Sequence, residues 1–159
     1  MSAGKKTNAM RILEQRAVPF ETREYEFEEE FSDAVTVAAK TNMPPEQVFK
    51  TIVMRNEHKN IFVFCVPANC EVNLKKARAV THSKEIAPVK PVELLGLTGY
   101  IRGGCSPLGM KKKYTVFFDE TAQLFDVIAV SAGVRGMQIL CAAEKLAAAA
   151  GADFADITL

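Results

Sequence analysis

The segment from residue 103 to residue 113, GGCSPLGMKKK, combines glycines, a hydroxyl, a thiol and three lysines in a pattern suited to anion binding. Gly103 and Gly104 permit close backbone approach or positive φ angles, and Pro107 fixes a turn. Backbone N–H groups in such a loop can form an anion nest or an oxyanion hole, although a tight bend explains the same residues equally well. A P-loop is excluded because Met110 stands where its lysine belongs.

Lys50 is the second candidate, because it is the only charge in the strand-like run VFKTIV and is followed by Thr51. A lysine that extends from a half-exposed strand into solvent is the simpler interpretation of this pattern. The functional interpretation is a cation held on a rigid strand as the partner of a phosphate or carbonyl group.

A second glycine turn, VSAGVRG at residues 130–136, follows a predicted strand and also suits a pocket made by backbone groups. We hypothesise that this turn, the first glycine loop and Lys50 converge on one cleft. The run Lys111, Lys112 and Lys113 is typical of a solvated surface, but beside a glycine loop it also suits a nucleic-acid backbone.

Protein nucleophiles are poorly indicated. Cys105 lies beside the glycines and would be reactive only if its pKa were lowered, while His58 and His82 lie in polar stretches. Cys65 and Cys141 have the surroundings of core residues. No CxxC pair or neighbouring histidine indicates zinc, so we expect no metal and unpaired thiols in a reducing cytoplasm.

The composition is that of one globular domain, predicted to span residues 1–159, with 48% hydrophobic and 25% charged residues. A formal net charge of +1 excludes a uniformly basic protein, so any contact with nucleic acid must use a local patch. The N-terminus lacks the apolar region of a secretory signal, and no apolar run is long enough to span a membrane. We therefore expect a cytoplasmic protein without a membrane partner.

Periodicity and caps predict the elements that must position these residues. Helices are expected at residues 7–18, 34–41, 73–80, 91–99 and 142–151, with a helical turn at 44–46. Extended segments are expected at 20–31, 51–56, 60–67, 83–89, 114–120 and 126–133. Because helices and strands mix without regular β-α-β alternation, the sequence predicts an α+β fold.

Four segments, KTNAMRIL, VFKTIV, TGYIRGGCSPLGMKKK and VSAGVRGMQI, together resemble the YbaK/EbsC family of aminoacyl-tRNA deacylases. The resemblance covers nearly the whole chain and is to the Cys-tRNA(Pro) deacylase type, which is related to the editing domain of bacterial prolyl-tRNA synthetases. It implies a single domain with a mixed, barrel-like β-sheet flanked by helices, and a site without metal or cofactor.

The resemblance also implies an activity and partners. The substrate would be the acceptor end of tRNA(Pro) mischarged with cysteine, and prolyl-tRNA synthetase would join a ternary complex. In this family the substrate's own thiol is thought to attack its ester carbonyl and expel the tRNA through a cyclic thioester. The scarcity of protein nucleophiles fits such a route.

Family positions carry over to named residues of this chain. Lys50 and Gly103 correspond to the catalytic positions, where the lysine engages the terminal nucleotide and the glycine backbone approaches the amino acid. The implied substrate-binding residues are Tyr25, Phe31, Thr51, Gly104, Ser106, Pro107, Gly133 and Gln138. The chain departs from the family at Gln138, where an aspartate is expected, and glutamine can form hydrogen bonds but carries no charge.

Three alternatives stay open at this point. A deacylase for alanine or another small amino acid would cleave substrates that lack a thiol. A non-catalytic module would bind tRNA ends, through the glycine loop and the lysine run, or prolyl-tRNA synthetase, without cleaving the ester. A thiol redox protein would depend on Cys105.

Overall fold

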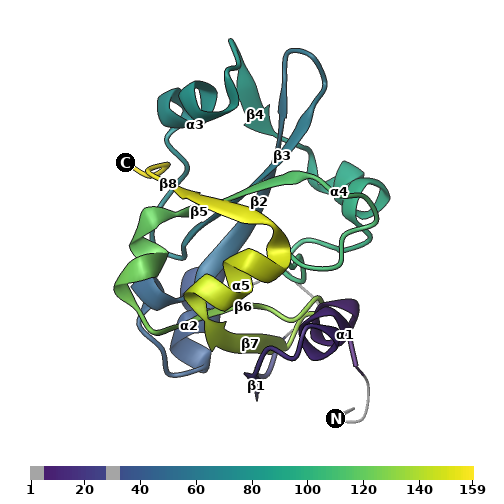
Figure 1. Cartoon of the computed structure of the whole chain (residues 1–159), viewed down its shortest axis with the longest axis vertical. Coiled ribbons are helices and arrows are strands. Elements are labelled where there is room, and N and C mark those ends of the chain that lie inside the picture. Colours follow the sequence, from purple (N-terminus) through teal and green to yellow (C-terminus); the bar gives the residue numbers. More distant parts are fainter. Residues whose placement is uncertain (1–5, 28–32) are drawn as a thin grey trace.

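The computed structural model describes residues 6–27 and 33–159, and within these ranges the strands form two β-sheets (Figure 1). The larger sheet has the strand order β4-β2-β3-β5-β8, and the smaller one has the order β1-β7-β6. The strands are β1 Phe20–Glu24, β2 Phe49–Asn56, β3 Ile61–Pro67, β4 Ile86–Pro88, β5 Thr115–Asp119, β6 Val127–Ser131, β7 Met137–Ala142 and β8 Ala152–Ala155. The sheets meet where Val48, just before β2, forms a parallel bridge with Ala129 of β6.

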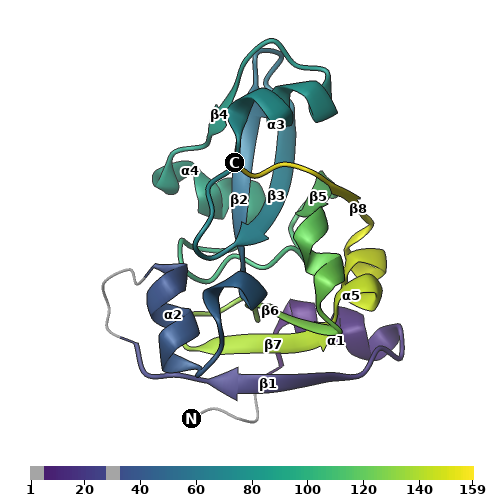
Figure 2. The ribbon, with the colours of Figure 1, turned by 90° about the vertical axis from the view of Figure 1, so that its left-hand side faces the viewer.

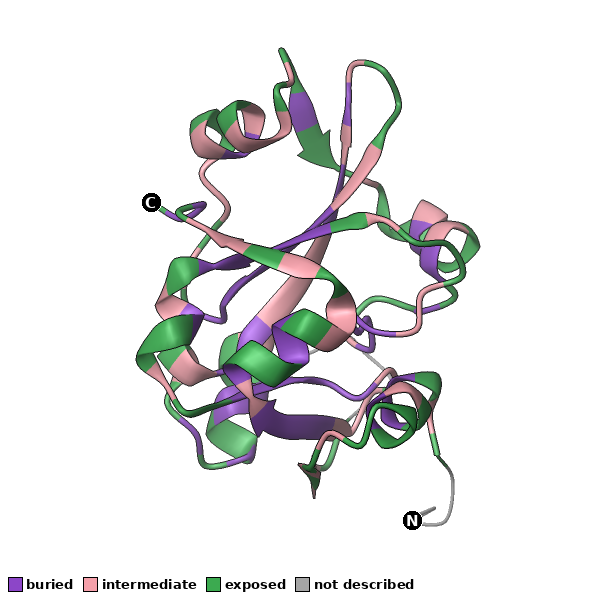
Figure 3. Ribbon diagram, in the orientation of Figure 1, coloured by how far each residue is buried: buried purple, intermediate pink, exposed green. Residues whose placement is uncertain are grey.

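The larger sheet is mixed. Strands β2 and β3 form an antiparallel hairpin, in which Lys50 lies opposite Val66 and Thr51 lies opposite Cys65. Strands β3, β5 and β8 pair in parallel. The inner part of β3 is fully buried, as its uninterrupted apolar run predicts for a strand covered on both faces (Figure 3).

The smaller sheet is antiparallel and has β7 at its centre. Gln138 of β7 lies opposite Arg23 of β1 on one side and Ser131 of β6 on the other. A residue in a central strand has neighbours on both sides, so the amide of Gln138 is buried although its side chain is polar.

The helices are set by local capping signals. They are α1 Asn8–Gln15, α2 Ala34–Lys40, α3 Leu74–Thr81, α4 Pro91–Thr98 and α5 Ala143–Ala150, with short 3₁₀ helices η1 Pro45–Gln47 and η2 Glu120–Leu124. Thr7 and Asp33 accept hydrogen bonds from the first turns of α1 and α2. Gly99 ends α4 with a φ of +85°, a conformation that costs glycine little. Figure 2 shows α2 and α5 on opposite sides of the molecule.

The α+β fold with a mixed sheet is confirmed, and each predicted helix is present. The structure adds the division of the strands into two sheets and the strands β7 and β8, which were not predicted. The extended segment predicted at 20–31 was too long in its described part, because β1 ends at Glu24 and Phe27 is exposed. Its remainder lies outside the described residues.

No helix in residues 6–27 and 33–159 is long and apolar enough to cross a membrane. In the same ranges, no group of His, Cys, Asp and Glu side chains is arranged to hold a metal ion.

Candidate active site

A cavity of about 600 Å³ lies between α2, the first half of β2, the loop after β3 and the glycine loop. Most of its wall is apolar, and several polar side chains reach it. Its polar lining consists of Asp33, Lys50, Thr51, Asn69, Glu71, Arg102, Ser131 and Gln138, together with the backbone of Gly103 and the thiol-bearing Cys105. A concave, largely apolar site with a few convergent polar groups is the usual form of a ligand pocket.

Lys50 supplies the cation of the strand wall. Its side chain is 21% exposed, and its Nζ lies 3.3 Å from the carbonyl oxygen of Ala68 and 3.3 Å from Oε1 of Glu71. The Glu71 side chain is 79% exposed, so solvent screens the pair and weakens it. An anion that enters the cavity can therefore displace the Glu71 carboxylate at small cost.

Asp33 adds a carboxylate at the mouth of the cavity. One oxygen accepts a hydrogen bond from the backbone N–H of Thr36 at 2.8 Å, which caps α2. Hydrogen bonding from Thr36 lowers the pKa of Asp33, and the charge of Lys50 contributes further. Asp33 is thus ionised at neutral pH and adds a negative charge to the cavity lining that also contains Lys50.

Backbone groups form the opposite wall. Gly103 has a φ of +85° and lines the cavity beside Cys105. Within the described residues, neither amide N–H of these two donates a hydrogen bond, whereas the N–H of Gly104 bonds to Ile101. Unpaired N–H groups facing a cavity are the elements of an oxyanion hole.

The glycine loop is held in shape by buried hydroxyls. The Tyr100 hydroxyl donates to the carbonyl of Leu108 at 2.5 Å, and Ser106 Oγ accepts from the N–H of Leu108 at 3.2 Å. Thr98 Oγ1 accepts from the N–H of Tyr100 at 3.0 Å. The positions of Gly103 and Cys105 therefore depend on side chains that do not reach the cavity.

The two glycine turns contact each other, although Gly133 and Gly136 are not among the lining residues of the cavity. A Cβ at Gly104 would lie 3.1–3.2 Å from the backbone of Val134 and Arg135, so a larger residue would have to push the second turn away by a few tenths of an ångström. Gly133 packs against the Tyr100 ring, where a Cβ would lie 2.9 Å from Cε1. Ser131 near the start of the second turn and Gln138 just after it line the cavity.

Gln138 presents an unsatisfied acceptor. Its residue is 5% exposed, and its Oε1 is buried without a hydrogen-bond partner in the described structure. An unpaired buried carbonyl is costly, and native proteins rarely keep one without a reason. A donor from a bound ligand would satisfy it.

The cysteines are not activated. Burial raises the pKa of Cys105 to about 12, and a hydrogen bond with Thr98 opposes this only in part. Burial also raises the pKa of Cys65 to about 12, and its Sγ lies 3.7 Å from the Thr51 hydroxyl. Both thiols are protonated at neutral pH, and a protonated thiol is a weak nucleophile.

The structure gathers some predicted site residues and leaves others apart. Lys50, Thr51, Gly103 and Gln138 line the cavity. The remaining described ones, Tyr25, Gly104, Ser106, Pro107, Gly133, Lys111, Lys112 and Lys113, are not among its lining residues. Phe31 lies outside the described residues.

These residues outside the cavity have identifiable positions. The N–H of Tyr25 donates to the carbonyl of Gly136 at 2.9 Å, and Ser106 and Pro107 are buried in the glycine loop. The run 111–113 is exposed and lies at the far end of that loop, where the stem of Lys111 packs against Gly99.

The sequence did not point to Glu71, Asn69 or Asp33 as residues of the cavity. No local signal marks Glu71, because its pairing with Lys50 joins residues separated by 21 positions.

Comparisons with known proteins identify a family and a fold. The family model described as the aminoacyl-tRNA editing domain matches residues 28–149. A protein of Enterococcus faecalis, described provisionally as Cys-tRNA(Pro)/Cys-tRNA(Cys) deacylase EbsC, is 40% identical over 153 residues, which cover 96% of this chain and 93% of the relative.

Two solved structures share the fold. One, described provisionally as a trans-editing enzyme for prolyl tRNA synthetase, superposes with a TM-score of 0.83 at 21% identity and covers 98% of this chain and 99% of its own. The other, a hypothetical protein, gives a TM-score of 0.86 at 15% identity, with 96% and 100% coverage.

Proposed function

The chain belongs to the aminoacyl-tRNA editing domain family, and we propose that it removes cysteine from mischarged Cys-tRNA(Pro) as a free-standing deacylase. The observation that carries this proposal is the cavity itself. It joins a lysine, unpaired backbone N–H groups and an unsatisfied acceptor, while its own thiol at Cys105 is protonated. Such a site can bind and orient an ester but offers no activated nucleophile of its own.

The attacking group is then the thiol of the substrate. Its sulfur forms a bond to the ester carbonyl carbon, the bond from that carbon to the ribose oxygen breaks, and the proton of the thiol ends on the ribose oxygen. The products are free tRNA and a cyclic thioester of cysteine, which water opens. Holding the sulfur near the carbonyl supplies most of the acceleration, because effective molarities in oriented intramolecular reactions are large.

The protein's residues have separate parts in this step. Lys50 engages the terminal nucleotide or its phosphate and fixes the ester against the strand wall. The N–H groups of Gly103 and Cys105 stabilise the developing oxyanion. Thr51 lies beside Lys50 on the same wall.

Gln138 orients the amino acid in this proposal. Its unpaired Oε1 accepts a hydrogen bond from the α-ammonium of the substrate. A neutral acceptor binds an ammonium less strongly than the aspartate expected at this position in the family, so positioning rather than charge is its contribution.

Recognition of the whole tRNA extends beyond the cavity. We propose that Lys111, Lys112 and Lys113 contact tRNA phosphates and that prolyl-tRNA synthetase supplies tRNA identity in a ternary complex in the cytoplasm.

The test is single-turnover deacylation of Cys-tRNA(Pro) beside Ser-tRNA(Pro) and Ala-tRNA(Pro), with uncatalysed hydrolysis subtracted. Serine nearly matches cysteine in shape but has a far weaker nucleophile, so we expect cleavage of the cysteine ester alone. Direct detection of the cyclic thioester by mass spectrometry of the quenched reaction would establish the thiol route.

Other outcomes would select the alternatives. Cleavage of Ala-tRNA(Pro) would show a deacylase that uses water or a tRNA hydroxyl. Binding of acceptor ends without cleavage of any ester would show a non-catalytic module.

A further inference from the structure

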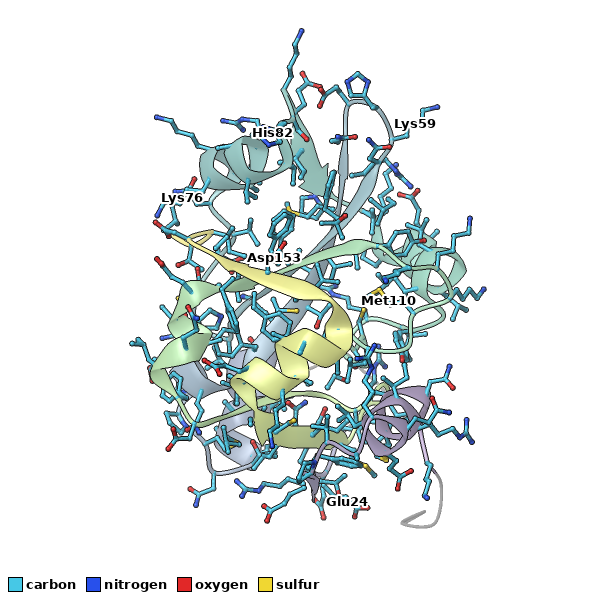
Figure 4. The ribbon with its side chains drawn as sticks, viewed as in Figure 1. Glu24, Lys59, Lys76, His82, Met110 and Asp153 are labelled. Atoms are coloured by element: carbon cyan, nitrogen blue, oxygen red, sulfur yellow. The ribbon has the colours of Figure 1, made fainter. Side chains whose placement is uncertain are left out.

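A basic surface covers the end of the molecule opposite the smaller sheet. Lys59 at the hairpin turn, Lys75 and Arg78 on α3, and Lys84 after α3 form it, and we call these the α3 basic surface. Figure 4 shows Lys59 of this surface at the hairpin end, and marks α3 by Lys76 and the end of α3 by His82. In the described ranges none of the α3 basic surface cations makes an ion pair, in contrast to neighbouring Lys76.

Two acidic side chains near this surface, Glu57 and Asp156, have hydrogen-bond or ion-pair partners within the protein. Glu57 accepts hydrogen bonds from the backbone N–H groups of Lys84 and Glu85 and contacts His58 at 3.3 Å. Asp156 pairs with Lys76 at 2.9 Å. Glu85 is exposed, and Glu57 also keeps its negative charge, because hydrogen bonds from backbone N–H groups, that of Glu85 first, lower its pKa. Three carboxylates, Glu57, Glu85 and Asp156, thus lie beside five cations, the four of the α3 basic surface and Lys76. Positive charge is therefore in excess here although the whole chain is nearly neutral at +1.

The loop before α3 connects this surface to the cavity. Asn69 and Glu71 line the cavity, and α3 begins at Leu74 in the same loop. Along β2, the distance from Lys50 to Asn56 at the hairpin end is about 20 Å at 3.3 Å per residue. A single strand advances about 3.4 Å per stacked nucleotide, and further when extended, so a short unpaired 3′ end can bridge this distance.

We propose that the α3 basic surface binds the phosphate backbone of the tRNA acceptor stem while the 3′ end occupies the cavity. This inference rests on the proposed function for the identity of the ligand. Lysine and arginine side chains that make no ion pair in the described ranges suit a phosphodiester backbone, which is recognised by charge. The surface then positions the duplex and contributes to affinity without reading sequence.

The test compares Lys75→Glu, the double variant Lys75→Glu/Lys84→Glu and the control Lys145→Glu. Lys75 and Lys145 are exposed, lie in the first turns of eight-residue helices and make no ion pair in the described structure. Helix α5, which carries Lys145, lies on a different side of the molecule from α3 (Figure 1). Melting temperatures establish that each variant folds.

Binding of uncharged tRNA(Pro) is measured first, by filter binding from 50 to 200 mM salt. The double variant should bind about tenfold more weakly at low salt. The negative slope of log K against log salt should become shallower by about 2, which is about 1 for each lost phosphate contact. Lys145→Glu should bind like the wild type. A wild-type slope and affinity in the double variant would overturn the inference.

Deacylation then separates this inference from the proposed function. With Cys-tRNA(Pro), the double variant should have a raised KM and an unchanged kcat, and with a cysteinyl ester of a CCA trinucleotide both constants should match the wild type. Absence of cleavage by the wild type would count against the proposed function alone, because binding of uncharged tRNA still tests the surface. A defect that appears only when prolyl-tRNA synthetase is present would assign the surface to a protein partner and overturn the RNA inference.

Discussion

The two walls of the cavity differ in what presents the functional group to a ligand. On the strand wall, the side chain of Lys50 projects from β2, whose backbone is fixed by pairing with β3 and β4. On the loop wall, the backbone of Gly103 faces the cavity, and no strand or helix fixes it. Buried hydroxyls such as that of Tyr100 take the place of a β-ladder.

Because of this difference, substitutions in the two walls have different effects. A side chain on a paired strand can be replaced with little change in the backbone, so substitutions there test chemistry. A backbone group held by remote side chains can be displaced from a distance, so substitutions in the loop test position.

The largest effect is expected on the strand wall. Lys50→Met keeps the length and packing of the side chain but removes its charge, and deacylation should fall about 10²- to 10³-fold, as for the loss of one electrostatic stabiliser. Stability should change by about 0.5 kcal/mol or less, because the side chain is partly exposed and its pair with Glu71 is screened. Single-turnover rates and thermal melts measure the two effects.

Glu71→Gln is the matched control for this substitution. It removes the partner of Lys50 but keeps the lysine, and activity should be retained. Wild-type rates in Lys50→Met would remove the strand wall from the mechanism.

The second effect tests the loop wall at the cavity. Gly103→Val introduces a side chain at a φ of +85° and into the substrate space, so deacylation should fall about 10²-fold. The strained backbone should cost about 1–2 kcal/mol of stability, and the fold should survive. Rates are measured well below the melting temperature.

Gly96→Ala controls for the loss of a glycine. Gly96 lies in α4 at a position where a Cβ would meet no atom within 4 Å, so alanine should stabilise the protein by about 0.5–1 kcal/mol and leave activity unchanged. Unaltered turnover in Gly103→Val would show that the loop wall does not contact substrate.

Elements that depend on local signals could be predicted from the sequence, whereas those that depend on distant pairing could not. Local signals predicted the helices, since caps such as Thr7 and stops such as Gly99 act within a few residues. Strand β7 was missed because its short run MQILCA forms a strand through pairing with β1, more than 100 residues earlier. Periodicity cannot report such distant pairing.

The candidate site divides in the same way. Lys50 and Gly103 were found because an isolated charge in an apolar run and a double glycine are visible locally. The orphan oxygen of Gln138 and the pairing of Lys50 with Glu71 depend on three-dimensional neighbours. The resemblance to a family pointed to Gln138, whereas its burial came only from the structure.

A third prediction concerns the side chains that hold the loop. Tyr100→Phe removes the hydroxyl that donates to Leu108 and leaves a buried carbonyl unpaired, so stability should fall by about 1–3 kcal/mol. Displacement of the loop should lower kcat about tenfold with little change in KM, because tRNA binding is not altered.

Tyr114→Phe is the comparison for Tyr100→Phe. The Tyr114 hydroxyl donates to the carbonyl of Leu97 at 2.7 Å, and neither residue lines the cavity. Stability should fall in both variants, but kcat should fall only in Tyr100→Phe. An equal loss of kcat in the two variants would indicate general loosening of the fold instead of control of the loop wall.

The smallest effect is expected at Cys105, whose thiol is the group on the loop wall that could act as a nucleophile if it were ionised. Burial disfavours the thiolate and raises the pKa of Cys105 to about 12, so at pH 9 only about 0.1% of it is ionised. Cys105→Ser should therefore leave the rate within about twofold of the wild type across pH 6–9.

The pH profile assigns the nucleophile. If the substrate thiol attacks, the rate with Cys-tRNA(Pro) should rise with pH towards the pKa of an ordinary thiol, about 8.5, in both wild type and Cys105→Ser. An inflection that disappears in Cys105→Ser would mean that the loop wall supplies a thiolate despite its burial, and the route through the substrate would fail. Equal profiles would mean that the loop wall acts on the substrate through its backbone groups, whereas the strand wall acts through the side chain of Lys50.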